Sequence, residues 1–180
     1  VIKYAFDVTE QKNRLADLEG QRAAIDKAQA VIEFDLTGKI LTANQNFLSV
    51  LDYSLPEIVG QHHRMFVDPA EVQSGAYRAF WEKLGRGEYD AGQYRRVGKD
   101  GREVWLQASY NPILDARGTP IKVVKFATDI TAQKQVAARV TEISGIVASA
   151  ASQMRATAEG MAGTAEETTR QAGAVTAAAE

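Results

Sequence analysis

The chain has 180 residues, with 21 basic and 23 acidic side chains, two histidines and no cysteine. This composition excludes a disulfide framework, a thiolate nucleophile and a zinc site of the usual Cys/His kind. A formal net charge of −2 without a basic block argues against nucleic-acid binding. No apolar run approaches the roughly 18 residues that span a bilayer, so we expect a reducing cytoplasm as the setting and no membrane segment in this chain.

A segment at the N-terminus recurs one domain length later. Residues 1–12 and 123–134 are identical at seven of twelve positions, at a constant offset of 122, and the matches include polar Asp, Thr, Gln and Lys residues. Such a repeat predicts tandem domains of one kind, with residues 1–8 as the last strand of the preceding copy. Chance similarity between two β-like runs is the alternative.

Residues 9–29 are polar with a thin apolar seam, which predicts a solvent-exposed connecting helix. Two short β-like runs follow, Val31–Asp35 and Ile40–Ala43, around a Leu36-Thr37-Gly38-Lys39 turn. This pattern predicts a β-hairpin.

Two sequence signals then mark helix starts. Ser54-Leu55-Pro56-Glu57 is a capping box, and Asp68-Pro69-Ala70-Glu71 repeats the device with proline at the first helical position. We expect the second signal to open a helix with an apolar stripe at Tyr77, Phe80, Trp81 and Leu84.

After this helix the apolar period changes to two. The pattern predicts strands near Tyr89–Val97, Glu103–Leu114 and Ile121–Asp129, joined by the glycine-containing turns Gly98–Gly101 and Asp115–Gly118. Short connections make antiparallel neighbours. The fold class is therefore α+β, a five-stranded antiparallel sheet with short helices on one face.

These elements resemble the PAS sensory domains over about residues 22–134. The resemblance rests on four separated motifs: Gly38-Lys39-Ile40 leading to Ala43–Phe47, the Tyr53–Gly60 helix, the Lys99-Asp100-Gly101 turn and the closing Asp129-Ile130-Thr131. It implies a PAS domain at 30–134, preceded by the connecting helix at 9–29. Residues 1–8 would then end an earlier PAS domain.

The last quarter of the chain has a different composition. All 14 aromatic residues lie between Tyr4 and Phe126, whereas residues 135–180 hold 14 alanines in 46 positions. A heptad seam runs through this tail, broken only at Gln171: Val136, Val140, Ile143, Val147, Ala150, Met154, Thr157, Met161, Thr164, Thr168 and Val175. The seam predicts a long coiled-coil helix that pairs with a partner.

A narrower resemblance concerns the receptors of bacterial chemotaxis. Residues 60–69 and 80–84 are similar to PAS domains of energy-taxis and methyl-accepting chemotaxis receptors, and 135–180 looks like the start of a chemoreceptor signalling helix. This resemblance implies a homodimer through the N- and C-terminal helices and a chemotaxis kinase and adaptor as downstream partners. A generic alanine-rich coiled coil is the alternative. We interpret Glu166 and Glu167 as solvated helix charges rather than methylation sites.

The sequence offers no catalytic motif. It has neither a Gly-x-Ser-x-Gly elbow nor a GxxxxGK[ST] phosphate loop, and the tail lacks the His-Glu pair of histidine-kinase dimerisation helices. We therefore expect no enzyme activity.

The resemblance places a ligand pocket between the inner face of the sheet and the helices. His63 matches a histidine in the flavin-binding region of aerotaxis receptors, His62 stands where they have proline, and Trp81 lies near a matching tryptophan. Further expected lining residues are Asn46, Met65, Phe66, Tyr94, Leu106 and Phe126. FAD is the first candidate cofactor and haem the second; the alternative is that both histidines are structural and the aromatic residues fill the core.

The Asp129-x-Thr131 motif is expected to couple the last strand to the C-terminal helix, with Arg96 or Lys99 as charge partners of the motif. Together these features predict a sensory and signal-transmitting module of a cytoplasmic chemoreceptor. Two alternatives stay open: a PAS spacer with an empty pocket that serves dimerisation or docking, and a PAS regulator of a kinase or cyclase.

Overall fold

The computed structural model describes residues 7–178, with side chains up to residue 174. The chain divides into two compact units between Ala132 and Gln133. Apart from Asp7 and Val8, the strand predicted at residues 1–8 lies outside the described residues and stays a prediction.

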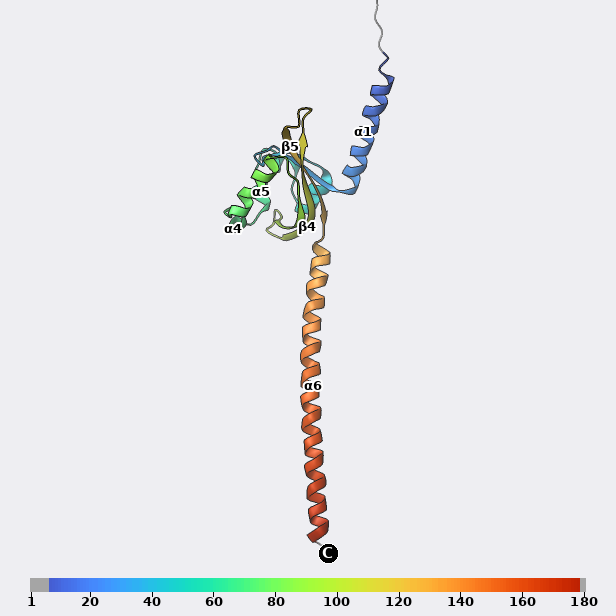
Figure 1. The fold of residues 1–180 in the computed structure, drawn as a ribbon, viewed down its shortest axis with the longest axis vertical. Helices are drawn as coiled ribbons and strands as arrows, with labels where there is room; N and C mark the ends of the chain where they lie inside the picture. Colours follow the sequence, from blue (N-terminus) through green and yellow to red (C-terminus); the bar gives the residue numbers. More distant parts are fainter. Residues whose placement is uncertain (1–6, 179–180) are drawn as a thin grey trace, which may run out of the picture. The chain divides into compact units, whose positions relative to one another are not determined.

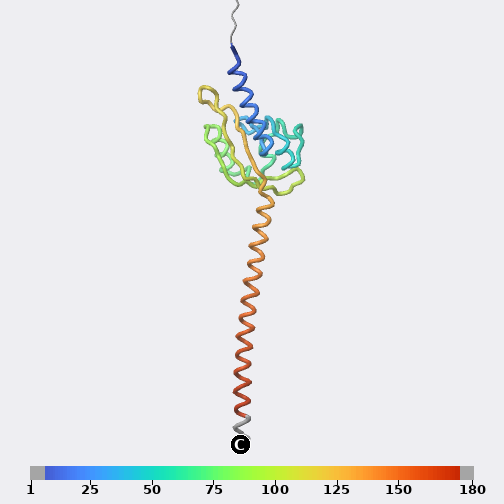
Figure 2. The backbone as a smooth tube through the Cα atoms, turned by 90° about the vertical axis from the view of Figure 1, so that its right-hand side faces the viewer, coloured from blue at the N-terminus to red at the C-terminus, as the bar shows by residue number. Residues whose placement is uncertain are grey.

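A five-stranded antiparallel sheet forms the centre of the first unit, in the order β2-β1-β5-β4-β3 (Figures 1 and 2). Its strands are β1 (Ala30–Phe34), β2 (Ile40–Ala43), β3 (Asp90–Val97), β4 (Glu103–Leu114) and β5 (Pro120–Asp129). The predicted sheet is confirmed, and each predicted strand end is correct to within one residue. Glycine turns interrupt the two-residue period sharply, which is why the sequence locates these ends so well.

Two of the turns use the same chemistry. Gly38 and Gly118 have positive φ, 88° and 81°, which glycine adopts without a steric penalty. In each turn an aspartate three residues earlier accepts two backbone N–H bonds, at 2.8 and 3.0 Å for Asp35 and at 2.8 and 2.9 Å for Asp115. Side chain and backbone together therefore fix the register of the strands that these turns join.

Short helices lie between β2 and β3. They are α2 (Gln45–Leu51), α3 (Leu55–Ile58), the 3-10 helix η1 (His63–Phe66), α4 (Pro69–Val72) and α5 (Gly75–Gly85). The predicted capping box at Ser54 and Glu57 is confirmed. The prediction that Asp68 opens the aromatic helix is wrong, because α4 ends at Val72 and the Ser74 hydroxyl caps α5 by accepting the Tyr77 N–H at 3.1 Å.

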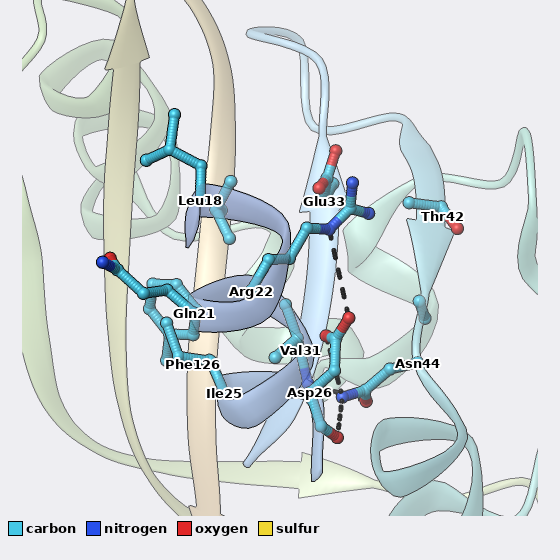
Figure 3. A pocket seen from close by; sticks show the side chains of 12 residues that line it. Leu18, Gln21, Arg22, Ile25, Asp26, Val31, Glu33, Thr42, Asn44 and Phe126 are labelled. Carbon is cyan, nitrogen blue, oxygen red and sulfur yellow. Dashed lines mark hydrogen bonds and ion pairs between the residues drawn. The ribbon is translucent and has the colours of Figure 1, made fainter. Parts of the chain in front are cut away.

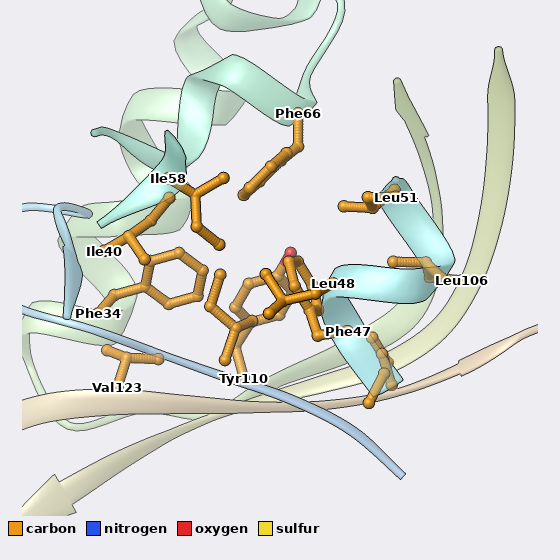
Figure 4. Close-up of a cluster of buried hydrophobic side chains, with 14 of the residues drawn as sticks. Phe34, Ile40, Phe47, Leu48, Leu51, Ile58, Phe66, Leu106, Tyr110 and Val123 are labelled. Atoms are coloured by element: carbon orange, nitrogen blue, oxygen red, sulfur yellow. The ribbon is translucent and has the colours of Figure 1, made fainter. Parts of the chain in front are cut away.

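The hydrophobic core lies between these helices and one face of the sheet, here called the inner face (Figure 4). Phe34, Phe47 and Phe66 are at most 1% exposed, and they come from β1, α2 and η1. Figure 4 shows Tyr110 projecting from the sheet into the same cluster, where it is completely buried. Strands on one side and four separate short helices on the other thus contribute to one core.

Helix α1 (Thr9–Ala28) precedes the sheet, as the sequence predicts, and continues through Gly20. No residue of α1 is buried. Its C-terminal end is tied to the region after β2, because the Asn44 Nδ2 donates to the carbonyl oxygens of Gln29 at 2.8 Å and Asp26 at 3.1 Å.

The long helix α6 (Thr131–Ala178) begins with the last two residues of the first unit and forms the described part of the second unit from Gln133 onward. At 1.5 Å per residue, its 48 residues extend about 70 Å. Every side chain from 135 to 174 is exposed, including Val140 at 57% and Ile143 at 58%. The long C-terminal helix is confirmed, whereas its pairing into a coiled coil stays a prediction.

Candidate functional site

His63 lies in the middle of the core and is completely buried. It begins η1, where its backbone N–H donates to the Gly38 carbonyl at 2.8 Å. Burial lowers the pKa of His63 well below its usual value, and the positive charges of Arg96 and Lys125 add to this effect. His63 is therefore neutral, with one ring nitrogen that donates and one that accepts.

A chain of hydrogen bonds passes through His63. Its Nδ1 lies 2.9 Å from the Tyr77 hydroxyl and its Nε2 lies 3.0 Å from the Tyr110 hydroxyl. Arg96 Nη2 donates to the same Tyr110 oxygen at 3.3 Å. Because a guanidinium only donates, the Tyr110 oxygen accepts the hydrogen bond from Arg96. The hydroxyl hydrogen of Tyr110 can then be donated to His63 Nε2, and His63 Nδ1–H donates to the Tyr77 hydroxyl.

Two buried cations flank Tyr110 on the neighbouring strands. Lys125 on β5 is the register partner of Tyr110 and is 1% exposed, and its ammonium lies 4.8 Å from the Tyr110 ring centroid. Arg96 on β3 is 2% exposed. Burial opposes ionisation of the Tyr110 hydroxyl, but Lys125 and Arg96 outweigh it and lower the pKa of that hydroxyl. Burial also lowers the pKa of Lys125.

Aromatic rings enclose this polar chain. Phe80 meets Tyr110 edge-on at 4.8 Å between centroids, and Trp81 lies 5.4 Å from His63 and 5.6 Å from Phe34. Two donors buried here, Trp81 Nε1–H and Arg96 Nε–H, have no acceptor in good hydrogen-bond geometry among the described residues, although Trp81 lies near enough to the Tyr77 hydroxyl to oppose the rise in its pKa that burial causes. The core is thus rich in hydrogen-bond donors and poor in acceptors.

Gly38 allows the rings to pack this closely. A Cβ at this position would lie 2.9 Å from atoms of both the His62 and the Trp81 rings. His62 itself is half-buried at the N-cap of η1, and its Nδ1 accepts the Arg64 N–H at 3.1 Å. Burial lowers the pKa of His62 as well.

The residues predicted to line the pocket do not all meet. The core and the side chains packed against it include His63, Met65, Phe66, Trp81, Tyr94 and Leu106. Asn46 lies apart from them, at the end of α1, where its Nδ2 donates to the Asp26 carbonyl at 3.0 Å. Phe126 is wrongly predicted to line the core, because strand side chains alternate and Lys125 and Ala127 of β5 take the inner and buried positions.

The predicted relay motif joins β4 to the first residues of α6. The Asp129 carboxylate accepts the backbone N–H of Thr131 at 2.8 Å and also the Thr131 hydroxyl hydrogen. Thr131 Oγ1 in turn accepts the Trp105 N–H at 2.9 Å, and the Ile130 N–H donates to the Trp105 carbonyl at 2.8 Å. The end of β5 and the start of the helix are therefore bonded to one residue of the neighbouring strand.

The expected charge partners of this motif are wrong. Arg96 pairs with Glu71 at 3.4 Å, and Lys99 pairs with Glu57 on α3. Arg96 is directed away because it lies on the inner face of β3, where its guanidinium reaches Tyr110.

A second concave site lies on the other side of the sheet, here called the outer groove (Figure 3). Its volume is about 420 Å³, and it lies between α1 and strands β1, β2 and β5. Leu18 and Ile25 of α1 line it together with Val31 and Phe126 of the sheet. The outer groove has no fully buried titratable side chain, and its lining also includes the charged residues Arg22, Asp26 and Glu33.

The sequence prediction missed Tyr77, Tyr110 and Lys125 as polar members of the site. A signal for Lys125 was present, because it shares a strand face with Val123 and Ala127, two apolar residues at two-residue spacing. The partners of Tyr110 had no local signal, since His63 is 47 residues away in sequence.

Comparison with known proteins identifies the fold. A family model described as the PAS fold matches residues 40–127. The biofilm dispersion protein BdlA of Pseudomonas aeruginosa is 43% identical over 131 residues, which are 73% of this chain and 31% of that protein. The aerotaxis receptor of Escherichia coli is 32% identical over 80 residues, 44% of this chain and 16% of that receptor. The chain thus spans a third or less of either relative.

Among solved structures, a light-oxygen-voltage domain studied with a flavin analogue has a TM-score of 0.54 at 24% identity, covering 68% of this chain and 93% of that domain. This likeness shows the fold alone. Within residues 7–178, no helix is both long and apolar enough to cross a bilayer, and no three metal-ligating side chains come together.

Proposed function

Because residues 40–127 of this chain belong to the PAS fold family, we propose that the chain is the sensory and signal-transmitting part of a chemotaxis receptor. The core around His63 senses a ligand or a redox or oxygen state, and α6 carries the signal. The similarity to an aerotaxis receptor and to BdlA supports this role. This role implies a chemotaxis kinase and an adaptor as partners, which would bind a signalling region downstream of α6. It also implies that the chain works in the cytoplasm and catalyses no reaction.

The observation that carries the proposal is the bonded junction at Thr131. Trp105 of β4 donates to the Thr131 hydroxyl oxygen and accepts from Ile130, so a shift of β4 moves the first residue of α6. Tyr110 lies on the same strand, five residues from Trp105, and contacts His63. One strand therefore links the buried polar chain to the start of the signalling helix. A ligand shifts this strand only by its differential affinity for two arrangements.

We further propose that the chain is a homodimer through α1 and α6. Helix α6, about 70 Å long, exposes a heptad seam in which Val140, Ile143 and Val147 are each 57–61% exposed. An isolated helix with such small side chains gains little from its own contacts. Pairing with a second copy would bury the seam, and in a two-fold dimer both helices would change packing together.

Of the two cofactors that the resemblance implies, flavin fits the His63 site better than haem does. Haem ligation needs a free imidazole nitrogen, and both nitrogens of His63 are hydrogen-bonded to tyrosines. His63 as arranged therefore does not fit the role of a haem ligand. The unpaired donors of Trp81 and Arg96 match the carbonyl oxygens of a flavin ring, which would supply redox chemistry when bound. An absorption spectrum of the purified protein distinguishes a flavin from haem.

Cross-linking through introduced cysteines tests signalling by α6, because the chain has no native cysteine. Val140→Cys lies on the seam and Arg139→Cys is its off-seam neighbour. We expect a disulfide dimer from Val140→Cys and little from Arg139→Cys, with the difference altered when the sensed ligand or redox state changes. Equal cross-linking at both positions, or a chain cut after Lys134 that dimerises as tightly, contradicts the role of α6.

One observation favours the spacer alternative. The space where PAS domains hold ligands is filled by the protein's own rings, with Phe34, His63 and Tyr110 completely buried. A colourless protein whose cross-linking responds to no cofactor or small molecule would support a docking or dimerisation spacer. A kinase or cyclase domain encoded downstream of residue 180 would instead support the regulatory alternative.

A further inference from the structure

The inner face of the sheet carries more positive charge than the core neutralises. Arg96 and Lys125 are 98–99% buried, yet the polar groups buried with them among the described residues are the neutral His63 ring and the Tyr110 hydroxyl, and neither is a carboxylate. Arg96 reaches one carboxylate, Glu71, at 3.4 Å, and Glu71 is 43% exposed. Among residues 7–174, Lys125 interacts with the Tyr110 hydroxyl and with no carboxylate. Buried charges are normally paired, so this arrangement lacks an anion.

The hydrogen bonds of the core show the same deficit. Among the described residues, Arg96 Nε–H and Trp81 Nε1–H are buried without an acceptor in good hydrogen-bond geometry, and both can only donate. Tyr110 already accepts from Arg96. The missing group must therefore be an acceptor.

Aromatic faces compensate only in part. The Lys125 ammonium lies 4.8 Å from the Tyr110 centroid and 5.8 Å from that of Phe47, and Arg96 lies 5.0 Å from the Tyr94 centroid. A ring quadrupole attracts a cation more weakly than a carboxylate at hydrogen-bond distance does. These rings do, however, offer faces and edges on which a planar ligand can pack.

From this charge and donor pattern we propose that the core binds a small aromatic carboxylate. Its carboxylate group lies beside the Tyr110 hydroxyl, between Arg96 and Lys125, and its ring packs against Phe80 and Trp81. This inference deepens the proposed sensory function by naming the ligand class. A flavin ring is a poorer match, since its neutral carbonyl oxygens accept hydrogen bonds but leave both cations without a counter-charge.

Helix α5 is the wall through which such a ligand enters. Only Leu84 of α5 is fully buried, whereas Tyr77, Phe80 and Trp81 are half-buried. An outward displacement of these rings would make the buried donors of the core accessible to a ligand and would break no hydrogen bond between the strands.

Ligand binding by the full chain tests the proposal. The probes are benzoate and phenylacetate, each compared with its neutral amide, by isothermal calorimetry and thermal unfolding. We expect saturable binding of at least one acid, at least about tenfold tighter than its amide, because a charge-assisted bond is lost in the amide. A matching rise in the unfolding temperature should accompany it.

Lys125→Met supplies the decisive variant and Lys122→Met its control. Lys122 is on the same strand, but its ammonium pairs with Glu33 at 2.7 Å outside the core. Lys125→Met should weaken acid binding by about tenfold or more and should fold at least as stably as wild type without ligand, because a buried unpaired charge is removed. Lys122→Met should bind the acid as wild type does.

Three results would overturn the proposal: acids that bind no better than their amides, Lys125→Met binding as tightly as wild type, or a purified protein that carries flavin and binds neither acid. The last result leaves the proposed sensory function standing. Conversely, an acid that binds through Lys125 without changing cross-linking at Val140→Cys confirms the site and contradicts the sensory function.

Discussion

Phe34 in the first unit is completely buried, whereas Ile143 in the second unit is 58% exposed. Both are large apolar residues in regular secondary structure, but the first contacts rings from a 3-10 helix, an α-helix and a strand, and the second has only its own helix beside it. The first unit thus carries its own stabilising contacts, whereas the apolar seam of α6 is exposed. Substitutions should therefore act on different observables in the two units.

The largest effect is expected in the core. Phe34→Ala should lower the free energy of unfolding by about 3–5 kcal/mol, because it removes a buried ring and leaves a cavity. Urea denaturation followed by tryptophan fluorescence measures this change. Ile143→Ala is the matched substitution in α6; it should leave that transition within about 0.5 kcal/mol and weaken self-association instead. An equal loss from both variants would contradict the separation of the two units.

A pH effect should distinguish the two adjacent histidines. His63 has a folded-state pKa well below its usual value of about 6.5. Between these two pKa values the histidine is protonated in the unfolded chain and neutral in the folded chain, so the unfolded chain binds one more proton. Stability is then retained above about pH 6.5 and lost as the pH falls, by up to about 1.4 kcal/mol per pH unit.

His63→Gln should remove most of this slope between about pH 7 and 5.5, whatever its effect on stability at neutral pH. His62→Gln is the control, and this variant should keep the larger part of the pH dependence of stability, since His62 is only half-buried. Urea midpoints at several pH values supply the data. A slope unchanged in His63→Gln would mean that other groups cause the pH dependence.

The hydrogen-bonded junction at the start of α6 should contribute less to the free energy of unfolding than the core does. Asp129→Ala removes the acceptor of the Thr131 N–H and hydroxyl, and should cost about 1 kcal/mol, as for other helix caps. We expect the change both in unfolding of the first unit and in the disulfide pattern of Val140→Cys. Thr141→Ala, whose hydroxyl bonds only to the Ala137 carbonyl within α6, should be silent in the unfolding assay.

The smallest effect is expected within α6. Arg170 forms a bidentate contact with Glu167, at 2.7 and 3.0 Å, on an exposed helix face. Arg170→Gln should change stability by no more than about 0.5 kcal/mol, an amount that salt reduces further. Circular dichroism at low and high salt measures it. A loss of several kcal/mol would show that this pair is buried against a partner, as in a larger helical bundle.

Local residue patterns determined most of the fold before any contact was known. Alternating apolar positions and turn glycines located every strand, and the capping box at Ser54 located α3. The aromatic stripe of α5 was also recognisable, but its start was not, because Ser74 competes with Asp68 as a helix cap and the two signals are only six residues apart.

The sequence by itself therefore determined the elements, the α+β class and the contrast between an aromatic domain and an alanine-rich helix, since these follow from short-range periodicity and composition. Only the tertiary structure decided the site. His63, Tyr110, Arg96 and Lys125 come from η1, β4, β3 and β5. Strand register brings only Lys125 opposite Tyr110, whereas the Arg96 side chain reaches Tyr110 from a position opposite Val104 and His63 comes from a helix packed on the sheet. Hydrogen bonds between residues 14 to 47 positions apart leave no mark in a local pattern. Because side chains alternate along a strand, Phe126 lies in the outer groove, and Arg96 lies on the inner face, where it contacts Glu71 and not Asp129.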